Sequence, residues 1–517
     1  MARYKDVNYQ QSKLIPIDFS TQIQPGTFEH TLSYLIDHEM DLTTFDQRYR
    51  NDDTGAPAID PAVLLKIILY AYSRGITSSR KIEQACRENI LFMALSADTQ
   101  PHFTTIADFI STLDQEIIDL FRSVLMICSD MRLIGGDMFA IDGCKLPSNA
   151  AKEWSGTKWE LSQKKKKIDQ AVRVMLQRHR ETDHQPHQPE QRDKEKHAIA
   201  TLKAKARKIK AWLDNHDDKP GKTGKPRKSN ITDNDSAKMK TSKGVIQGYD
   251  GVAAVDHQHQ IVVHAEAFGE AQEHDLLQPM IETTRAHFQA IGKSNNIFNH
   301  TRLTADSGFH NEANVKYLYE HGIDGYLPDI GFRKRDPRFA HAERFRARDK
   351  KDKQDYYGRQ SQTFTSPDFH YDAATHTCIC PAGKSLYSNG RSNNLGGYEA
   401  LKFRGAKRDC RPCPVRDRCL RDPAKTDTRQ VAIFIGRSKQ VPFKYTDNMK
   451  QKIDSPDGRY QYSRRMGIVE PVFAHVCSVL KLNRFSLRTK RKVDIQWKLY
   501  CIVHNLLKIH RYGAMPR

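Results

Sequence analysis

The sequence predicts an α/β protein whose core is interrupted by inserts and preceded by an all-helical N-terminal domain. Apolar residues recur at helical spacing over residues 27–128, short apolar strands then alternate with amphipathic helices, and the last segment returns to helix. At 517 residues the chain exceeds one ordinary core. The predicted divisions are a helical domain at 1–130, a first core part at 131–330 with a charged helical insert at about 158–243, an inserted cysteine-bearing subdomain at 331–459, and a C-terminal helical core part at 460–517.

The N-terminal domain shows clear helix boundaries. Asp60 and Pro61 open the run PAVLLKIILYAYSRG, and Gly75 closes it, as Pro near a helix start and Gly past its end do. Ser78 or Ser79 is a candidate N-cap for a helix in SSRKIEQACRENILFMAL. Periodicity does not separate helix-turn-helix DNA binding from a bundle that serves packing or dimerisation, so both interpretations stay open.

The core segment alternates strands and helices. A strand at 137–146 is expected to end at Asp142, and two further strands are joined by a polar turn at residues 256–260. After an amphipathic helix comes RLTAD, a strand ending at Asp306. NEANVKYLYEHG then predicts a helix capped by Asn311 and stopped by Gly322, and GIDGYLPD predicts another strand.

The charged insert predicts two solvated helices between Trp159 and Trp212, joined by a loop that contains two prolines. Its Lys164 to Lys167 run is either a solvated helix face or a contact with phosphate. Residues 217–230, DDKPGKTGKPRKSN, have the composition of a flexible basic linker.

Lys and Arg outnumber Asp and Glu by 83 to 62, and this net charge of +21 is spread over several segments, which favours a polyanionic partner over a basic protein with none. No apolar run is long enough to cross a bilayer, so no membrane partner is expected. The N-terminus lacks the apolar run of a secretory signal, which favours the cytosol. Five of the ten cysteines lie between Cys378 and Cys419, as metal-binding cysteines do in a reducing compartment.

Three separated segments carry carboxylates that fit divalent-metal chemistry: MFAIDGCKL around Asp142, RLTADSGFH around Asp306, and RRMGIVEPVFAHV around Glu470. Paired divalent ions need hard oxygen ligands that converge from separate elements. Asp142 and Asp306 are each expected at a strand end before a glycine turn. Pro471 fits the first turn of a helix, so Glu470 is expected at or just before that helix's N-terminus. Taken singly, each is more simply a cap or a solvated carboxylate.

Two other carboxylates compete with Asp142: Asp137 starts the same strand and should emerge at its opposite edge, and Asp256 lies in the hairpin turn. His264 and Glu266 are read as a polar strand face. A second candidate metal site is a tetrahedral structural zinc site, favoured over unmetallated thiols. Its expected ligands are Cys380, Cys410, Cys413 and Cys419.

The sequence motifs around these residues, and their order along nearly the whole chain, resemble those of the DDE transposases of bacterial insertion sequences. PAVLLKIILYAYSRGITSSRKIEQACREN with PHFTTIADF resembles the family's helical domain. AIDGCKLPSNAA and LTADSGFH resemble the motifs that carry its two catalytic Asp residues, and GYDGVAAVD resembles the hairpin between them. VEPVFAHV resembles the helix that carries its catalytic Glu, and YCIVHNLLKI resembles its closing helix. The resemblance implies a ribonuclease H-like core on which Asp142, Asp306 and Glu470 hold two Mg²⁺ or Mn²⁺ ions. It also implies cleavage of element ends and their joining to target DNA.

The family also carries a Tyr and an Arg before the Glu, which Tyr462 and Arg465 match, and a Lys after it, where this sequence has Cys477. Lys481, eleven positions after Glu470, is the candidate to present an ammonium on the same helical face for DNA binding. The expected partners are terminal inverted repeats and target DNA, with a homodimer at synapsis, in the bacterial cytoplasm at the nucleoid. The rival interpretations are a metal-dependent endonuclease without strand transfer and a non-catalytic DNA-binding descendant.

Overall fold

The computed structural model describes most of the chain. The described residues are 10, 16–49, 57–182, 189–221, 224–241, 244–293, 296–339, 363–388, 390, 393–395, 398–437 and 444–514. They form a mixed α/β fold, as the sequence predicts. They divide into two compact units, one of Met1–Ile330 with Met449–Arg517 and the other of Gly331–Asn448.

The described residues before the first strand form helices. Their bounds are α1 (Phe28–Tyr34), α2 (Thr43–Asp46), α3 (Pro61–Ser73), α4 (Ser79–Glu88), α5 (Ile90–Leu95), α6 (Phe103–Thr112) and α7 (Gln115–Asp130). The predicted start of α3 is confirmed, because the Asp60 carboxylate accepts a hydrogen bond from the Ala62 amide at 2.7 Å. The single helix expected after Ser78 is two, because Asn89 leaves helical geometry and caps α5 with its side chain.

One sheet forms the centre of the first unit. Its strands are β1 (Met138–Pro147), β4 (Ala237–Thr241), β5 (Gly244–Asp256), β6 (Val262–Phe268), β7 (Arg302–Ala305) and β8 (Gly325–Tyr326). The order is β4-β5-β1-β7-β8, with β6 also paired to β5. β5 is antiparallel to β1, whereas β7 is parallel to β1 and β8 to β7. The predicted hairpin of β5 and β6 is confirmed, with Gln260 in its turn at φ 61°.

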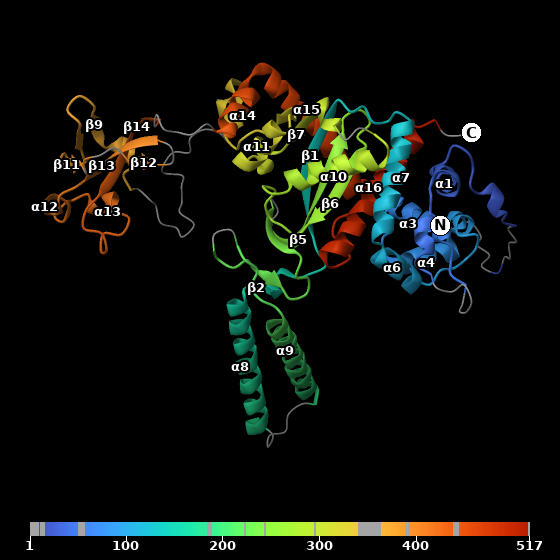
Figure 1. The fold of residues 1–517 in the computed structure, drawn as a ribbon. Helices are drawn as coiled ribbons and strands as arrows, with labels where there is room; N and C mark the ends of the chain where they lie inside the picture. The colour runs from blue at the N-terminus through green and yellow to red at the C-terminus, as the bar shows by residue number, and fades with distance from the viewer. Residues whose placement is uncertain are drawn as a thin grey trace, which may run out of the picture. The chain divides into compact units, whose positions relative to one another are not determined.

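Helices pack on both faces of this sheet (Figure 1). On one face, Phe288 of α10 (Leu277–Ala290) stacks on Phe139 of β1, with ring centroids 5.8 Å apart. On the other, Trp497 of α16 (Lys490–Tyr512) donates its indole hydrogen bond to Val252 of β5 at 3.0 Å and lies where Gly251 has no side chain. α11 (Glu312–Glu320) begins as predicted, because Asn311 accepts from the Asn314 amide at 2.8 Å.

A helical hairpin is inserted between β1 and β4. α8 (Lys158–Thr182) and α9 (Pro189–Asn215) pack along each other, as Figure 1 shows. At the root of the hairpin, β2 (Ser155–Gly156) pairs with β3 (Ser229–Asn230). The expected flexible linker at 217–230 is therefore partly wrong, because β3 is paired and Lys219 forms a β-bridge with Arg227.

The second unit contains a small antiparallel sheet and two short helices. Its elements are β9 (His370–Asp372), β10 (Thr377–Ile379), β11 (Ser385–Ser388), β12 (Asn393–Leu395), β13 (Tyr398–Arg404), α12 (Lys407–Cys410), α13 (Arg416–Cys419) and β14 (Gln430–Arg437). Phe369, Leu386, Phe403 and Val431 are buried together with Cys378 in its apolar core.

After this unit, α14 (Tyr445–Asp454) leads into α15 (Pro456–Ala474), which contacts β1 and β7 of the central sheet. A π-helical turn (His475–Val479) follows, and α16 closes the chain. None of the described helices combines the length and the apolar character needed to cross a membrane.

Candidate active site

Two of the three predicted catalytic carboxylates lie next to each other across the central sheet. On one side β1 pairs Asp142 with Ala253 of β5, and on the other it runs parallel to β7 as far as the pair Ile141 and Ala305. Asp142 and Asp306 are the next residues in this register. Because paired residues of adjacent parallel strands point to the same face, the two carboxylates lie side by side there.

The prediction that the first strand ends at Asp142 is wrong. β1 continues to Pro147, because the long strand β5 stays paired with it as far as Gly248. Asp142 is therefore in mid-strand, at the point where the parallel partner β7 stops. The strand predicted to end at Asp306 ends one residue earlier, at Ala305, so that Asp306 directly follows it.

Both carboxylates are fixed by the backbone that follows them. The Gly143 amide donates to Asp142 Oδ1 at 2.8 Å, and the Gly308 amide donates to Asp306 Oδ1 at 3.1 Å. Each hydrogen bond holds one oxygen and limits side-chain rotation. The site is thus preorganised before any ligand binds.

Arg465 is the counter-charge of this site. It projects from α15, its side chain is 8% exposed, and its guanidinium donates to Asp142 Oδ2 in a buried ion pair. Its Cζ lies 5.7 Å from the ring centroid of Tyr462. Burial lowers the pKa of Arg465, but electrostatic interactions with Asp142, Tyr462 and Asp306 raise it by more. The net pKa lies above the ordinary value of arginine, so the guanidinium paired with Asp142 stays charged.

Burial raises the pKa of Asp142 to about 6. The Arg465 charge and the Gly143 hydrogen bond oppose this rise, while the nearby Asp306 carboxylate adds to it. A buried carboxyl beside a second carboxylate is stabilised in its ionised form by added positive charge. The arrangement of the two carboxyl groups therefore favours the binding of a further cation beside Asp142.

Glu470 is not at a helix start, so that prediction is wrong: it lies inside α15, and Pro471 follows it in the helix interior. Pro471 has no amide hydrogen for the Gly467 carbonyl, and the Gln260 side chain donates to that carbonyl instead, at 3.0 Å. This substitute hydrogen bond lets the helix continue past the proline.

The structure does not bring Glu470 to the two Asp residues. It is exposed, and it lies five residues after Arg465, about 140° round the helix. Among the described residues, no three Asp, Glu, His or Cys side chains are close enough together to hold one metal ion. The described geometry thus assembles Asp142, Asp306 and Arg465, with Glu470 nearby in the sequence but on another side of α15.

The expectation that Lys481 shares a helical face with Glu470 is wrong. The chain has left the helix by this point, Lys481 has φ 62°, and its side chain packs against Gly75. It therefore does not share a helical face with Glu470. Cys477, in the place of the family's Lys, lies with its sulfur 3.8 Å from that of Cys144 on β1.

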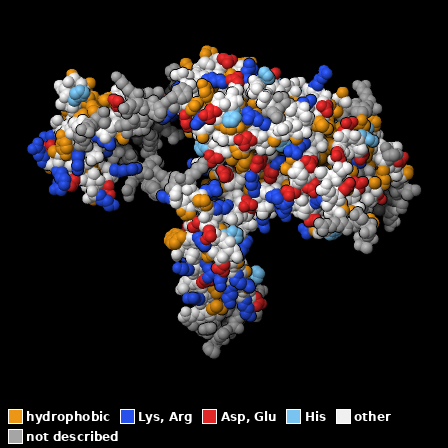
Figure 2. Space-filling view, viewed as in Figure 1, with side chains coloured by type: hydrophobic (Ala, Val, Ile, Leu, Met, Phe, Trp, Pro, Cys, Tyr) orange, Lys and Arg blue, Asp and Glu red, His pale blue; other side chains and the backbone are white. Residues whose placement is uncertain are grey.

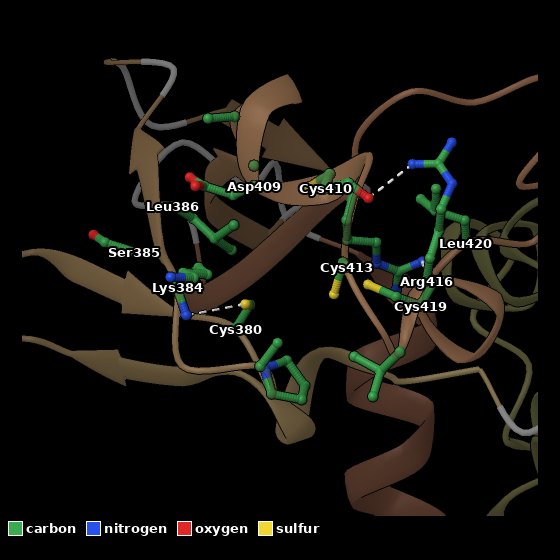
Figure 3. Close-up of a pocket in the computed structure, with 16 residues that line it drawn as sticks. Cys380, Lys384, Ser385, Leu386, Asp409, Cys410, Cys413, Arg416, Cys419 and Leu420 are labelled. Atoms are coloured by element: carbon green, nitrogen blue, oxygen red, sulfur yellow. Dashed lines mark hydrogen bonds between the residues drawn. The ribbon is translucent and has the colours of Figure 1, made fainter.

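The four cysteines expected to bind zinc line one pocket of the second unit, as Figure 3 shows. Cys410 and Cys419 end two short helices, Cys413 lies between them, and Cys380 lies across the pocket. The Lys384 amide donates to Cys380 Sγ at 3.3 Å. Burial raises the pKa of Cys419, and its electrostatic interactions with Cys410, Cys380 and Cys413 add to that rise.

Two family models match the chain. One, described as a transposase DDE domain, matches residues 379–510, and the other, described as a transposase domain (DUF772), matches residues 17–112. Together the two matches indicate an insertion-sequence DDE transposase. No curated protein matches it.

The two matches indicate an enzyme of DNA transposition whose partner is DNA. The DDE match contains the cysteine pocket, Arg465 and Glu470, while Asp142 and Asp306 precede it. The other match covers helices α1 to α6 of the transposase. Enzymes of the DDE family generally use divalent metal ions such as Mg²⁺.

The transposase also contains a second set of charges that sequence reasoning missed. Lys145 lies directly across from Asp250, which is fully buried, and its ammonium is 2.7 Å from the Glu273 carboxylate. Burial and then the Glu273 charge raise the pKa of Asp250 well above its ordinary value. A side chain on Gly143 would collide with Asp250, and one on Gly308 with Glu273. These carboxyl groups therefore pack against the two glycines that follow closely after Asp142 and Asp306. The one available signal was an acidic residue inside an apolar strand.

Replacing Lys145 with Met should lower the free energy of unfolding by about 2–3 kcal/mol, because the partly buried Glu273 carboxylate loses its counter-charge. Urea denaturation of the metal-free transposase measures the loss. The double variant Lys145→Met, Glu273→Gln should recover part of it, since the uncompensated charge is then gone. Equal losses in both variants would show that the ion pair itself does not matter.

Proposed function

We propose that this transposase cleaves the ends of its element and joins the freed 3′-hydroxyl groups to target DNA, by phosphodiester hydrolysis followed by transesterification. The observation that supports the proposal is that Asp142 of β1 lies beside Asp306, the residue after β7, with the Arg465 guanidinium paired to Asp142 as the counter-charge. A phosphodiester brings negative charge to such a site. A preorganised guanidinium together with bound cations would stabilise the charge that develops on its oxygens.

A ribonuclease H-like core is part of the proposal. It is supported by a mixed sheet with one antiparallel strand, β5, beside the central strand β1, and by helices on both sheet faces. The hairpin of α8 and α9 and the unit Gly331–Asn448 then interrupt this core after β1 and after β8. The proposed role of the N-terminal helices is DNA binding or dimerisation.

Two Mg²⁺ or Mn²⁺ ions would be held by Asp142, Asp306 and Glu470. The donor set fits, because hard oxygen ligands suit these ions and burial already disfavours the ionised form of Asp142 in their absence. When bound, such ions polarise the phosphoryl group and lower the pKa of water. Glu470 lies between Gly467 and Pro471, where the Gln260 side chain replaces the backbone hydrogen bond that the proline cannot donate. This turn of α15 is therefore not held by its own helical hydrogen bond, and we propose that it can change its twist at a lower cost than a regular turn.

The protein's own groups have distinct roles in this proposal. The Gly143 and Gly308 amides hold Asp142 and Asp306 in orientation, and Arg465 neutralises charge next to Asp142. Tyr462 lies beside the Arg465 guanidinium and is proposed to contact DNA with it. Lys481 is proposed to contact DNA from the loop after the π-helical turn, not from the helix.

The deciding experiment is a joining assay. Purified transposase is incubated with labelled element ends, a target plasmid and Mg²⁺, and the products are resolved by size. Label covalently joined to plasmid supports the proposal. Cleaved ends without joining would identify a nuclease, and uncut ends would identify a non-catalytic DNA-binding descendant. Two ends held in one complex of two chains would support the proposed homodimer, and co-localisation with the nucleoid in a bacterial cell would support the proposed location.

The pKa of Asp142 predicts a pH dependence. This pKa is raised from 3.8 to about 6, so below pH 6 a proton competes with metal for the carboxylate. The apparent Mg²⁺ affinity, measured from cleavage rates at a series of Mg²⁺ concentrations, should fall about tenfold for each pH unit below 6 and level off above about pH 7. An affinity that is constant from pH 5 to pH 7 would contradict this assignment.

A structural zinc ion bound by Cys380, Cys410, Cys413 and Cys419 remains a proposal. Among the described residues, these thiols are not close enough together to form a set of metal ligands. Support comes from the convergence of all four on one pocket and from the soft sulfur donors that zinc prefers. Zinc would stabilise the second unit by holding its two short helices to the turn after β10.

Elemental analysis should therefore find about one zinc per chain in the purified transposase. Cys413→Ser should remove it and lower the melting temperature of the second unit, because structural zinc contributes directly to folding. Cys378→Ala, a change in the apolar core of the same unit, serves as the control and should keep the zinc. Absence of zinc from protein grown in zinc-supplemented medium would disprove the site.

A further inference from the structure

The hairpin of α8 and α9 carries a concentration of positive charge that the active site does not use. The two helices contain sixteen Lys and Arg against seven Asp and Glu. Figure 2 shows these basic side chains gathered along the hairpin. An excess of this size attracts polyanions, but a solvated helix surface can carry it too. The arrangement of the charges favours a binding surface for a polyanion over a solvated helix surface.

That arrangement is a hollow between the helices. Its lining residues are Lys165, Asp169, Lys203, Ala206, Arg207 and Lys210. In α9 the four lining positions have the spacing i, i+3, i+4 and i+7, which places them on one face of the helix. In α8, Lys165 and Asp169 are one turn apart and form an ion pair at 2.7 Å. Basic groups from both helices thus face a common space.

Three of the cations in this hollow have no partner. Among the residues that the structure describes, Lys203, Arg207 and Lys210 make no ion pair or side-chain hydrogen bond, and all three are exposed. The single acidic group, Asp169, neutralises only Lys165. One anion and four cations give the hollow a net charge of about +3. Its unpaired ammonium and guanidinium groups can donate hydrogen bonds to anionic oxygens.

The root of the hairpin is held firmly. Leu161, Ile209 and Trp212 are buried together between the helices. Below them, the ammonium groups of Lys164 and Lys208 lie 5.1 and 5.3 Å from the Trp154 ring centroid. Cation–π contacts and an apolar seam restrict the motion of the two helices against each other. The charged hollow is therefore a persistent feature of the hairpin.

We infer that this hollow is a binding surface for the phosphate backbone of duplex DNA, and that the hairpin is a DNA-binding arm distinct from the catalytic carboxylates. The inference rests on the proposed function for its choice of polyanion. The hollow is lined by no aromatic side chain that could stack on bases, as single-strand binding surfaces have. The 25 residues of α8 span about 37 Å, which is close to one turn of duplex. Contacts to phosphate alone make the arm indifferent to sequence.

The test compares two variants that lose the same charge from the same hairpin. The hollow variant is Lys165→Gln, Lys203→Gln, Arg207→Gln, Lys210→Gln. The matched control changes four exposed lysines that do not line the hollow: Lys166→Gln, Lys167→Gln, Lys196→Gln, Lys205→Gln. Glutamine keeps a high helix propensity. Circular dichroism verifies that both variants retain the helical content of the full chain.

Binding of the full chain to a 30-base-pair duplex is measured by fluorescence anisotropy in EDTA over a series of salt concentrations. The hollow variant should bind on the order of a hundredfold more weakly near 0.1 M salt, and the slope of log affinity against log salt should become shallower by about 3 to 4. The control should lose less than about tenfold, with a slope change below about one. Equal losses in the two variants, or none in the hollow variant, would overturn the inference.

No strand is cut in EDTA, so this result is independent of the joining assay. Failure of the hollow variant to differ from its control leaves the catalytic proposal intact. Failure of the joining assay together with a hollow-dependent affinity would instead identify a DNA-binding protein that retains the arm. A charge-preserving variant, Lys203→Arg with Lys210→Arg, should keep the parent's affinity and slope, since backbone phosphates accept hydrogen bonds from either cation.

Discussion

Asp142→Asn and Asp306→Asn should each reduce strand cleavage by about a thousandfold or more. Each change removes one negative oxygen donor from the adjacent pair on β1 and β7. Losing a ligand that helps to place a catalytic cation removes several kcal/mol of transition-state stabilisation, and each 1.36 kcal/mol is a factor of ten in rate. Cleavage of a labelled element end in Mg²⁺, followed over time under single-turnover conditions, measures the loss.

The two variants should differ in stability, which separates a catalytic effect from a folding effect. Asp142→Asn leaves the buried Arg465 guanidinium without its counter-charge, so the free energy of unfolding should fall by about 3 kcal/mol. Asp306→Asn keeps a carbonyl oxygen that can accept from the Gly308 amide, so its stability should change little. Cleavage that survives in the stable Asp306→Asn variant would remove Asp306 from the catalytic set.

Much of the local structure followed from the sequence, because capping and hydrophobic periodicity are local effects. Asp60 before Pro61, Asn311 before α11 and the polar turn of the β5–β6 hairpin each occur where short-range chemistry places them. The choice of Asp142 and Asp306 came from residues at or near strand ends, combined with a family resemblance. Their adjacency is a consequence of strand order, which local pattern does not determine.

Two of the failed expectations involve partners distant in sequence. β1 continues past Asp142 because β5, which begins about 100 residues later, stays paired with it. Pro471 was read as a helix start, but Gln260 replaces the lost hydrogen bond and keeps the helix intact. The sequence did not predict the roles of Asp250 and Glu273, because no local motif indicates that a buried carboxyl group packs against a glycine elsewhere in the chain. Such features depend on tertiary contacts and are visible only in three dimensions.

Glu470→Gln provides the most demanding test of the proposed site. Glu470 is exposed and makes no ion pair with another described residue, so its replacement should change the free energy of unfolding by less than about 0.5 kcal/mol. The rate of strand cleavage should nevertheless fall by about a thousandfold, as for the two Asp variants, if the turn at Gly467 and Pro471 brings this carboxylate to the site during reaction.

A matched control is Glu320→Gln, which removes an exposed carboxylate from α11 together with its ion pair to Lys316; it should change the free energy of unfolding by less than about 0.5 kcal/mol and leave cleavage unchanged. Gly467→Ala is a second test of the proposed change in twist. A methyl group at this position would meet no atom within 4 Å, and alanine stiffens the helix relative to glycine. If α15 must retwist, this variant should cleave more slowly at unchanged stability or above it. Normal cleavage in Glu470→Gln would remove Glu470 from the catalytic set.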